Sequence, residues 1–101
     1  ICLSINRDDT EDHPAATEQF INAFRAMAVT LDKRFEVATP LITLRKHEVV
    51  LVGKDLGVNF SKTYSCLVGG ERHCGACAQC LARKRAFRLA DLTEPAGFYE
   101  G

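Results

Sequence analysis

The sequence contains no tryptophan, one methionine and only three prolines among its 101 residues. It also lacks an excess of either charge, since 13 basic and 13 acidic residues cancel. No overall electrostatic field therefore favours binding to nucleic acid or to a membrane surface. No apolar run approaches the roughly 20 residues that a membrane-spanning helix needs, and no repeat or low-complexity tract is present. These absences favour an ordinary globular protein, for which neither direct nucleic-acid binding nor membrane association is expected.

What the sequence has in abundance is cysteine in one place. Four of the five cysteines fall between residues 66 and 80, in the order C-x7-C-x2-C-x2-C. Thiolates are soft, charged ligands that suit a tetrahedral Zn²⁺ ion, and Gly70 and Gly75 allow sharp turns on either side of the second cysteine. We therefore predict one metal site, with Zn²⁺ as the preferred ion and the following ligands: Cys66, Cys74, Cys77 and Cys80.

Three other readings of these cysteines remain open. A disulfide framework is typical of small secreted proteins, which usually carry an even number of cysteines. Iron–sulfur proteins share the C-x2-C-x2-C run but continue it with a fourth cysteine and a proline, whereas Leu81 follows Cys80 here. A catalytic dithiol needs only one pair. The fifth cysteine, Cys2, lies in an apolar stretch and is predicted to be a buried packing residue. A thiol-rich chain of this kind is expected in the cytoplasm.

Hydrophobic periodicity predicts a strand–helix–strand–helix order followed by a cysteine-rich segment. That order is typical of a parallel α/β sheet covered by helices. Two strands cannot form such a sheet alone, and the chain opens inside an apparent strand, so we expect it to be a portion of a longer polypeptide. The predicted elements are strands at 1–5 and 35–38, helices at 14–31, 43–57 and 77–90, an extended segment at 58–64, and loops at 6–13 and 93–101.

Two segments carry a resemblance to known families. The run P-L-I-x-L-x-K-x-E-V-V at residues 40–50, followed by L-G-V at 56–58, resembles the second signature of the PP-loop ATP pyrophosphatases. The run T-x-S-C at 63–66, followed by G-G-E-x-H-C-G-x-C-x-x-C-x-x-R-x-x-A-F at 69–87, resembles the C-terminal part of the 7-cyano-7-deazaguanine synthase (QueC) family. Residues 6–21 match this family more loosely.

The resemblance implies a fold and an activity. The expected fold class is α/β, the C-terminal part of a Rossmann-like (adenine nucleotide alpha hydrolase-like) parallel sheet, with a zinc-stapled helical appendage. Residues 1–62 would belong to the PP-loop domain, and residues 63–101 to the four-cysteine zinc-binding segment and tail. The family is cytoplasmic and often dimeric, so we expect a homodimer. Its members use ATP with Mg²⁺ and ammonia to convert 7-carboxy-7-deazaguanine, a deazapurine carboxylate, to its nitrile for queuosine biosynthesis.

Particular residues acquire roles through the same resemblance. The four cysteines would hold a structural zinc ion, because four protein sulfurs leave no position open for water. Lys46 would contact the phosphates or the adenylate from the first turn of a helix, although a solvated lysine is the plainer reading. Asp9 would hydrogen-bond the substrate, but an exposed acidic loop explains it equally well. A basic run on the last predicted helix is interpreted as a solvated face: Arg83, Lys84, Arg85 and Arg88. Arg83 is the exception, because it matches the family motif and would orient a loop or contact a thiolate.

Two departures from the family pattern keep alternatives open. The phosphate loop S-G-G-x-D-S is not found in these residues, and without its backbone N–H groups the pyrophosphate has no cradle, so this piece alone should not hydrolyse ATP. In addition, Pro14 is followed by Ala15 and Ala16, where the family carries Asp, Cys and Arg. The alternatives are a QueC-like paralogue that adenylates a different acceptor, and a non-catalytic zinc-stapled binding module.

Overall fold

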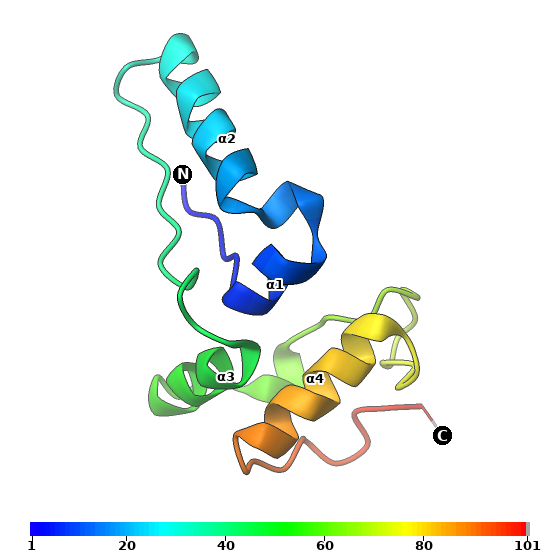
Figure 1. The fold of residues 1–101 in the computed structure, drawn as a ribbon. Helices are drawn as coiled ribbons and strands as arrows, with labels where there is room; N and C mark the ends of the chain where they lie inside the picture. Colours follow the sequence, from blue (N-terminus) through cyan, green and yellow to red (C-terminus); the bar gives the residue numbers. More distant parts are fainter. Residues whose placement is uncertain (101) are drawn as a thin grey trace. The chain divides into compact units, whose positions relative to one another are not determined.

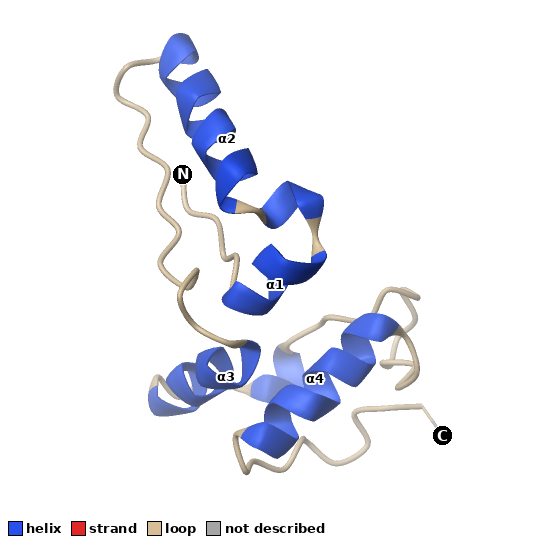
Figure 2. Cartoon of the chain, in the orientation of Figure 1, coloured by secondary structure: helices blue, strands red, loops and turns tan. Residues whose placement is uncertain are grey.

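The computed structural model describes residues 1–100 as short helices joined by loops (Figures 1 and 2). Its contacts divide the chain into two compact units, Ile1–Arg45 and Lys46–Gly101, which we describe separately. The predicted domain boundary at residues 62 and 63 concerns the whole family fold and stays a prediction. Within residues 1–100, no helix is both long and apolar enough to cross a membrane.

The first unit contains α1 (Arg7–Asp12), η1 (Pro14–Ala16) and α2 (Glu18–Leu31). Helix α1 replaces the loop predicted at residues 6–13, so that prediction was wrong. The sequence there has no apolar period, but a capping box compensates: the Asp9 N–H donates to Asn6 Oδ1 and the Asn6 N–H donates to Asp9 Oδ2, each at 3.0 Å. Reciprocal caps of this kind stabilise a helix start without any tertiary packing.

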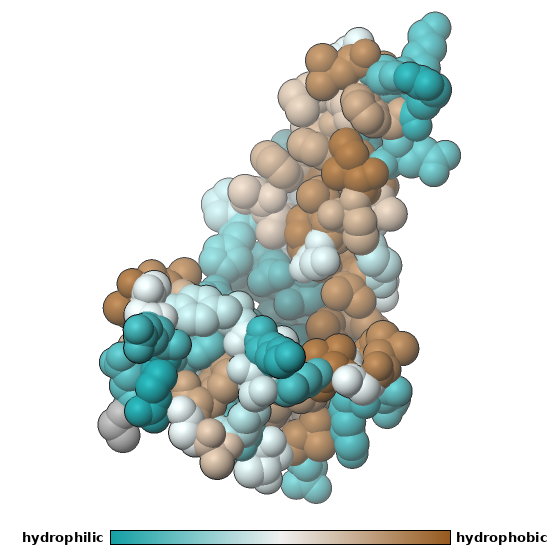
Figure 3. All heavy atoms as spheres, turned by 180° about the vertical axis from the view of Figure 1, so that it is seen from behind, coloured by the Kyte–Doolittle hydropathy of each residue, from teal (hydrophilic) through white to brown (hydrophobic). Residues whose placement is uncertain are grey.

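The predicted helix at 14–31 is confirmed in its second part only. Thr17 interrupts it, because its Oγ1 accepts the Phe20 N–H at 3.2 Å and caps α2 at its N-terminus. Pro14 instead begins a separate 3₁₀ turn. Ile21 and Ala28 are the buried residues of α2. Much of its apolar surface stays exposed, and Figure 3 shows brown, apolar residues gathered over this helix. The large apolar side chains exposed on α2 are Phe20, Met27, Val29 and Leu31.

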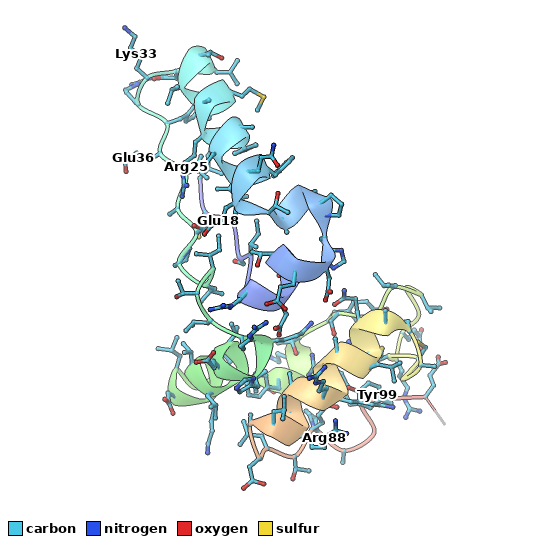
Figure 4. All side chains as sticks on the ribbon, viewed as in Figure 1. Glu18, Arg25, Lys33, Glu36, Arg88 and Tyr99 are labelled. Carbon is cyan, nitrogen blue, oxygen red and sulfur yellow. The ribbon has the colours of Figure 1, made fainter. Side chains whose placement is uncertain are left out.

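The two predicted strands lie side by side but form a single parallel bridge, between Cys2 and Ala38. The Leu3 N–H donates to the Ala38 carbonyl at 2.9 Å, and the Ala38 N–H donates to the Ile1 carbonyl at 2.8 Å. From α2, the Arg25 side chain (labelled in Figure 4) reaches the same segment and donates to the Val37 carbonyl at 3.2 Å. Within residues 1–100 there is no longer strand, and the only other pairing of this kind is an isolated parallel bridge between His73 and Tyr99, so the predicted parallel sheet is not seen in this part of the polypeptide.

The second unit contains α3 (Lys46–Asp55), η2 (Phe60–Lys62) and α4 (Ala78–Leu89). Helices α3 and α4 pack on each other around a small core of Val50, Ala86, Phe87 and Ala90, which Phe60 and Leu92 flank. The Phe60 and Phe87 rings meet edge to face at 5.1 Å, a favoured aromatic geometry. The segment predicted to be extended at 58–64 therefore contains a 3₁₀ turn that brings Phe60 into this core.

Helix α3 begins at Lys46, three residues after the predicted cap Thr43, and ends as predicted before Gly57. The Gly57 N–H donates to the Lys54 carbonyl at 3.0 Å and the Val58 N–H donates to the Gly53 carbonyl at 2.9 Å. This is a Schellman motif, in which the residue after the cap adopts a left-handed conformation. Gly57 has a φ of 74°, which explains why the helix stops there.

Candidate metal centre

The four predicted cysteine ligands converge in the second unit. Their Sγ atoms all lie within 4.8 Å of one another, and the sulfurs of Cys74 and Cys80 are 3.9 Å apart. Zn–S bonds of about 2.3 Å in a tetrahedron require sulfurs separated by roughly 3.8 Å, so this spacing suits one ion. All five cysteines are free thiols, which argues against the disulfide reading. An iron–sulfur cubane would spread its sulfurs around four iron atoms rather than around one.

Backbone N–H groups surround three of these sulfurs. The Val68 and Cys74 N–H groups donate to Cys66 Sγ, each at 3.4 Å. The Leu67 and Cys80 N–H groups donate to Cys77 Sγ at 3.5 and 3.4 Å. Cys74 Sγ accepts from the two residues that follow the turn, Ala76 at 3.4 Å and Cys77 at 3.3 Å. Because each N–H favours a charged thiolate over a thiol, the loop is shaped to present anionic sulfur.

The pKa values of the thiols reflect these surroundings. The Cys74 N–H, assisted by that of Val68, lowers the pKa of Cys66 to about 6, and the Leu67 N–H lowers the pKa of Cys77. Burial raises the pKa of Cys80 to about 12, and this side chain is 0% exposed. A thiolate in so buried a place needs a cation beside it. The donor set therefore fits a metal ion, and zinc is consistent with it.

Two glycines form the turns that bring the sulfurs together. Gly75, between Cys74 and Cys77, has a φ of 78°, and Gly69 has a φ of 84°. Residues with a side chain rarely adopt these angles, and a Cβ on Gly75 would lie 3.1 Å from Lys84 Nζ. The prediction for Gly75 is confirmed. The prediction for Gly70 was wrong, because the left-handed turn lies one residue earlier.

Helix α4 presents two of the four clustered cysteines. Cys77 is its N-cap, and its Sγ accepts the Cys80 N–H as a serine or aspartate oxygen would. This confirms the helix predicted at 77–90 to within a residue at each end. Cys80 then lies in the first turn, so Cys77 and Cys80 share one rigid element.

His73 is not a ligand, although it precedes Cys74. Its Nε2 accepts the Ser65 N–H at 3.0 Å, which leaves the ring proton on Nδ1. The ring is stacked on Phe98 with centroids 4.0 Å apart. Burial lowers the pKa of His73, in keeping with a neutral imidazole. Through this hydrogen bond, His73 fixes the backbone of Ser65, the residue just before Cys66.

The basic run on α4 divides into two kinds of residue. Lys84, Arg85 and Arg88 are exposed, as predicted for a solvated face. Arg83 is only 6% exposed and pairs with Glu94, with Nε and Oε1 2.6 Å apart. Arg83 was set apart from the solvated face as a residue to orient a loop or contact a thiolate, and its burial agrees with that distinction. Sequence reasoning missed its partners in the tail, for which no periodicity or spacing gave a signal.

The remaining predicted residues are not members of the cysteine cluster. Lys46 is the first residue of α3, and its Nζ donates to Gln79 Oε1 at 3.3 Å, in the turn between Cys77 and Cys80. Asp9 lies in the first unit, where one carboxylate oxygen serves the α1 capping box. Lys46 belongs to the second unit and Asp9 to the first. Cys2 is exposed, so the prediction of a buried cysteine was wrong. Within residues 1–100 the segment around Cys2 pairs only through its bridge to Ala38, which leaves the Cys2 side chain uncovered.

Comparison with known proteins gives a consistent result. The profile of the family described as "Queuosine biosynthesis protein QueC" matches residues 1–91. The chain is 34% identical over 101 residues to the 7-cyano-7-deazaguanine synthase of Methanobrevibacter smithii, covering 99% of this chain and 44% of that protein. It is 38% identical over 95 residues to the synthase of Methanothermobacter thermautotrophicus, covering 92% and 42%. It is 36% identical over 101 residues to that of Allorhizobium ampelinum, covering 97% and 43%.

No solved structure matches the chain significantly. The chain spans less than half the length of the three relatives named above. The family match nevertheless covers nearly all of its residues, including the whole cysteine cluster. The family resemblance, which rested on the cysteine run and the motif residues around it, is thereby confirmed, and the chain belongs to the QueC family.

Proposed function

We propose that this chain is part of an ATP-dependent C–N ligase that converts 7-carboxy-7-deazaguanine to 7-cyano-7-deazaguanine in queuosine biosynthesis. The observation that carries the proposal is the QueC match over residues 1–91, together with relatives that bear the name of that synthase. Because the chain covers 44% or less of these relatives, it would supply one part of the catalytic protein. The phosphate loop would lie in another part.

The chemistry requires activation of a poor electrophile. A carboxylate resists attack by ammonia, so ATP would transfer AMP to its oxygen and release pyrophosphate. Ammonia would then displace AMP to give the amide. A second ATP would activate the amide oxygen in the same way, so that this oxygen leaves with AMP while the nitrogen loses its two protons and the nitrile forms. Stabilising the charge on the phosphates during this transfer is the main electrostatic task of such a site. Mg²⁺ bound with ATP would share that task.

Zinc would have a structural role here. The four sulfurs fill a tetrahedral shell, and a filled shell offers no position for water or substrate. Cys66, Cys74, Cys77 and Cys80 would therefore hold the ion and fix the loop before α4. Their charges and N–H partners are suited to this task, while catalysis would take place elsewhere.

The parallel sheet of the family would be completed by the rest of the polypeptide. The Cys2–Ala38 bridge is parallel, as expected for two strands of such a sheet. Helix α2 carries exposed apolar side chains such as Phe20 and Leu31, which a sheet of this kind normally covers. The rest of the chain in the relatives is long enough to provide the missing strands.

Lys46 is proposed to contact the ATP phosphates from the N-terminus of α3. Backbone N–H groups at a helix start favour an anion, and the Gln79 contact holds the ammonium group near α4. Replacing Lys46 with alanine in the full-length protein should raise KM for ATP at least tenfold, while zinc content stays unchanged. Steady-state kinetics would measure this, with Lys54→Ala at the other end of α3 as the matched control. Equal effects of the two substitutions would exclude the phosphate role.

Asp9 is proposed to contact the deazapurine, in competition with its capping bond to Asn6. The residues after Pro14 differ from the family pattern, which favours a second candidate function: a paralogue that adenylates a different acceptor. A non-catalytic zinc-stapled module is the remaining alternative. A cytoplasmic location and a homodimer complete the proposal, in line with the family resemblance.

The decisive experiment is an assay of the full-length protein with ATP, Mg²⁺, ammonia and 7-carboxy-7-deazaguanine. The proposal expects AMP release that depends on the deazapurine, and a nitrile product by mass spectrometry. AMP release with another carboxylate alone would identify a paralogue. No AMP release with any acceptor, from a zinc-loaded and folded protein, would favour the binding module.

A further inference from the structure

Arg83 is a buried cation whose guanidinium makes three directed hydrogen bonds. Its Nε donates to Glu94 Oε1 at 2.6 Å, Nη1 donates to Thr63 Oγ1 at 2.7 Å, and Nη2 donates to the Phe60 carbonyl at 3.2 Å. The guanidinium also lies 3.9 Å from the centre of the Phe98 ring. Burying a charge is costly unless it is paired and hydrogen-bonded. This set of partners indicates that the side chain organises the segments around it.

Those segments flank the metal ligands. Arg83 lies one helical turn after Cys80 on α4, and its partner Thr63 lies three residues before Cys66. Cys66 itself belongs to a segment without helix or strand. Through Thr63 and Phe60, Arg83 therefore connects the rigid helix that carries Cys80 to the loop that leads to Cys66.

The tail connects Arg83 to another ligand. Its residues 94–100 return along α4, beside which Tyr99 is labelled in Figure 4. Lys84 Nζ lies 4.4 Å from the centre of the Tyr99 ring. The His73 N–H donates to the Phe98 carbonyl at 3.3 Å, and the Glu100 N–H donates to the His73 carbonyl at 2.7 Å. His73 immediately precedes Cys74. Glu94 and Phe98, which Arg83 holds, thus fix the strand-like bridge that positions Cys74.

The four ligands differ in how they can leave the ion. Cys77 and Cys80 are fixed together at the start of α4, whereas Cys66 and Cys74 lie on loops. Release of the ion requires the loop sulfurs to separate from the helix sulfurs. The contacts that oppose this separation include the hydrogen bond from Lys84 Nζ to the Gly75 carbonyl at 2.8 Å. They also include those of Arg83 and of the tail, which lies beyond the residues matched by the family profile.

We propose that Arg83 is a positioning residue of the metal centre, which acts through the tail at 94–100 to hold the Cys66 and Cys74 loops closed over the ion. Arg83 does not contact the metal and is not a ligand. It slows release of the ion, while the number of ions bound is set by the four sulfurs. The inference rests on the proposed zinc ion.

The test measures zinc release from the loaded full-length protein into an excess of a chromophoric chelator. Arg83→Lys keeps the charge but replaces the planar guanidinium, whose three nitrogens each serve a different partner, with a single ammonium nitrogen that cannot reach all three. Glu94→Gln keeps the shape but removes the ion pair. Both variants should bind one zinc per chain and release it at least tenfold faster than the wild type. Arg85→Lys and Arg88→Lys, on the exposed face of the same helix (Arg88 is labelled in Figure 4), should release it at the wild-type rate.

A general loss of stability is distinguished by Val50→Ala, which weakens the core of the same unit without touching the tail. Faster release in Arg83→Lys and Glu94→Gln than in a Val50→Ala variant of equal melting temperature would support the positioning role. Equal release rates in all three, or wild-type rates in the first two, would overturn it. If the wild-type protein itself carried no zinc, the proposed structural zinc would be refuted, and this outcome is distinct from a failure of the positioning role of Arg83.

Discussion

Replacing Cys77 with serine is expected to abolish stable zinc binding and to loosen residues 60–100, the largest effect that any single substitution should have here. Serine preserves the cap of α4, because a hydroxyl oxygen accepts the Cys80 N–H as the sulfur does. It removes only the thiolate. Structural zinc contributes on the order of 10 kcal/mol to the folding of small metal-organised segments, which is comparable to the whole stability of a typical domain.

The measurements are the zinc content of the purified full-length protein and hydrogen exchange across residues 60–100. Cys2→Ser is the matched control, since Cys2 is exposed and outside the cluster; it should keep one zinc and wild-type protection. A Cys77→Ser protein with wild-type protection in the segment would show that the metal does not organise it. Full zinc occupancy in that variant would exclude Cys77 as a ligand.

The metal cluster was predictable because its signal is local. Four sulfurs within fifteen residues can reach one ion in few ways, and Cys77 combines a place in the sulfur cluster with the capping position of α4. The end of α3 was equally readable, since Gly57 can adopt the left-handed angle that a Schellman motif requires. In both cases the residue type has one dominant physical role: clustered cysteines suit a metal ion, and glycine adopts the left-handed backbone angle.

The elements that were predicted wrongly depend on contacts between particular side chains, which hydrophobic periodicity does not reveal. Helix α1 is stabilised by Asn6 and Asp9, two polar residues in a stretch that otherwise resembles a loop. The 3₁₀ turn at 60–62 exists because Phe60 packs on Phe87, which lies 27 positions later in the chain. Cys2 was expected to be buried because its neighbours are apolar, but burial needs covering strands, and within residues 1–100 the segment around Cys2 pairs through a single bridge, to Ala38.

The environment of Arg83 could not be derived from sequence for a related reason. Its match to the family motif drew attention to the position, but an arginine within a basic run is usually solvated. Its partners Glu94 and Thr63 lie 11 and 20 residues away along the chain, on opposite sides. Neither belongs to a helix or strand whose period would have predicted the meeting. Tertiary contact alone distinguishes Arg83 from Arg85 and Arg88.

Phe87→Ala is expected to have the second-largest effect, a loss of about 3–5 kcal/mol in the stability of the second unit, the usual cost of deleting a buried phenylalanine ring. Phe87 is 3% exposed and central to the core between α3 and α4. Its removal would leave the Phe60 ring without its edge-to-face partner and take away a ring that lies 5.1 Å from the Arg83 guanidinium. Native-state hydrogen exchange of the α3 and α4 amides in the zinc-loaded protein measures this loss directly.

Leu89→Ala is the matched control for this substitution, because Leu89 lies two residues later on α4 but is 55% exposed. Its effect should stay within about 0.5 kcal/mol, as for most surface changes. If the metal alone organised the unit, the two variants would exchange alike as long as zinc stayed bound. A large loss confined to Phe87→Ala would instead establish that the α3–α4 core contributes stability that zinc cannot replace, so that metal and core together hold the segment in shape.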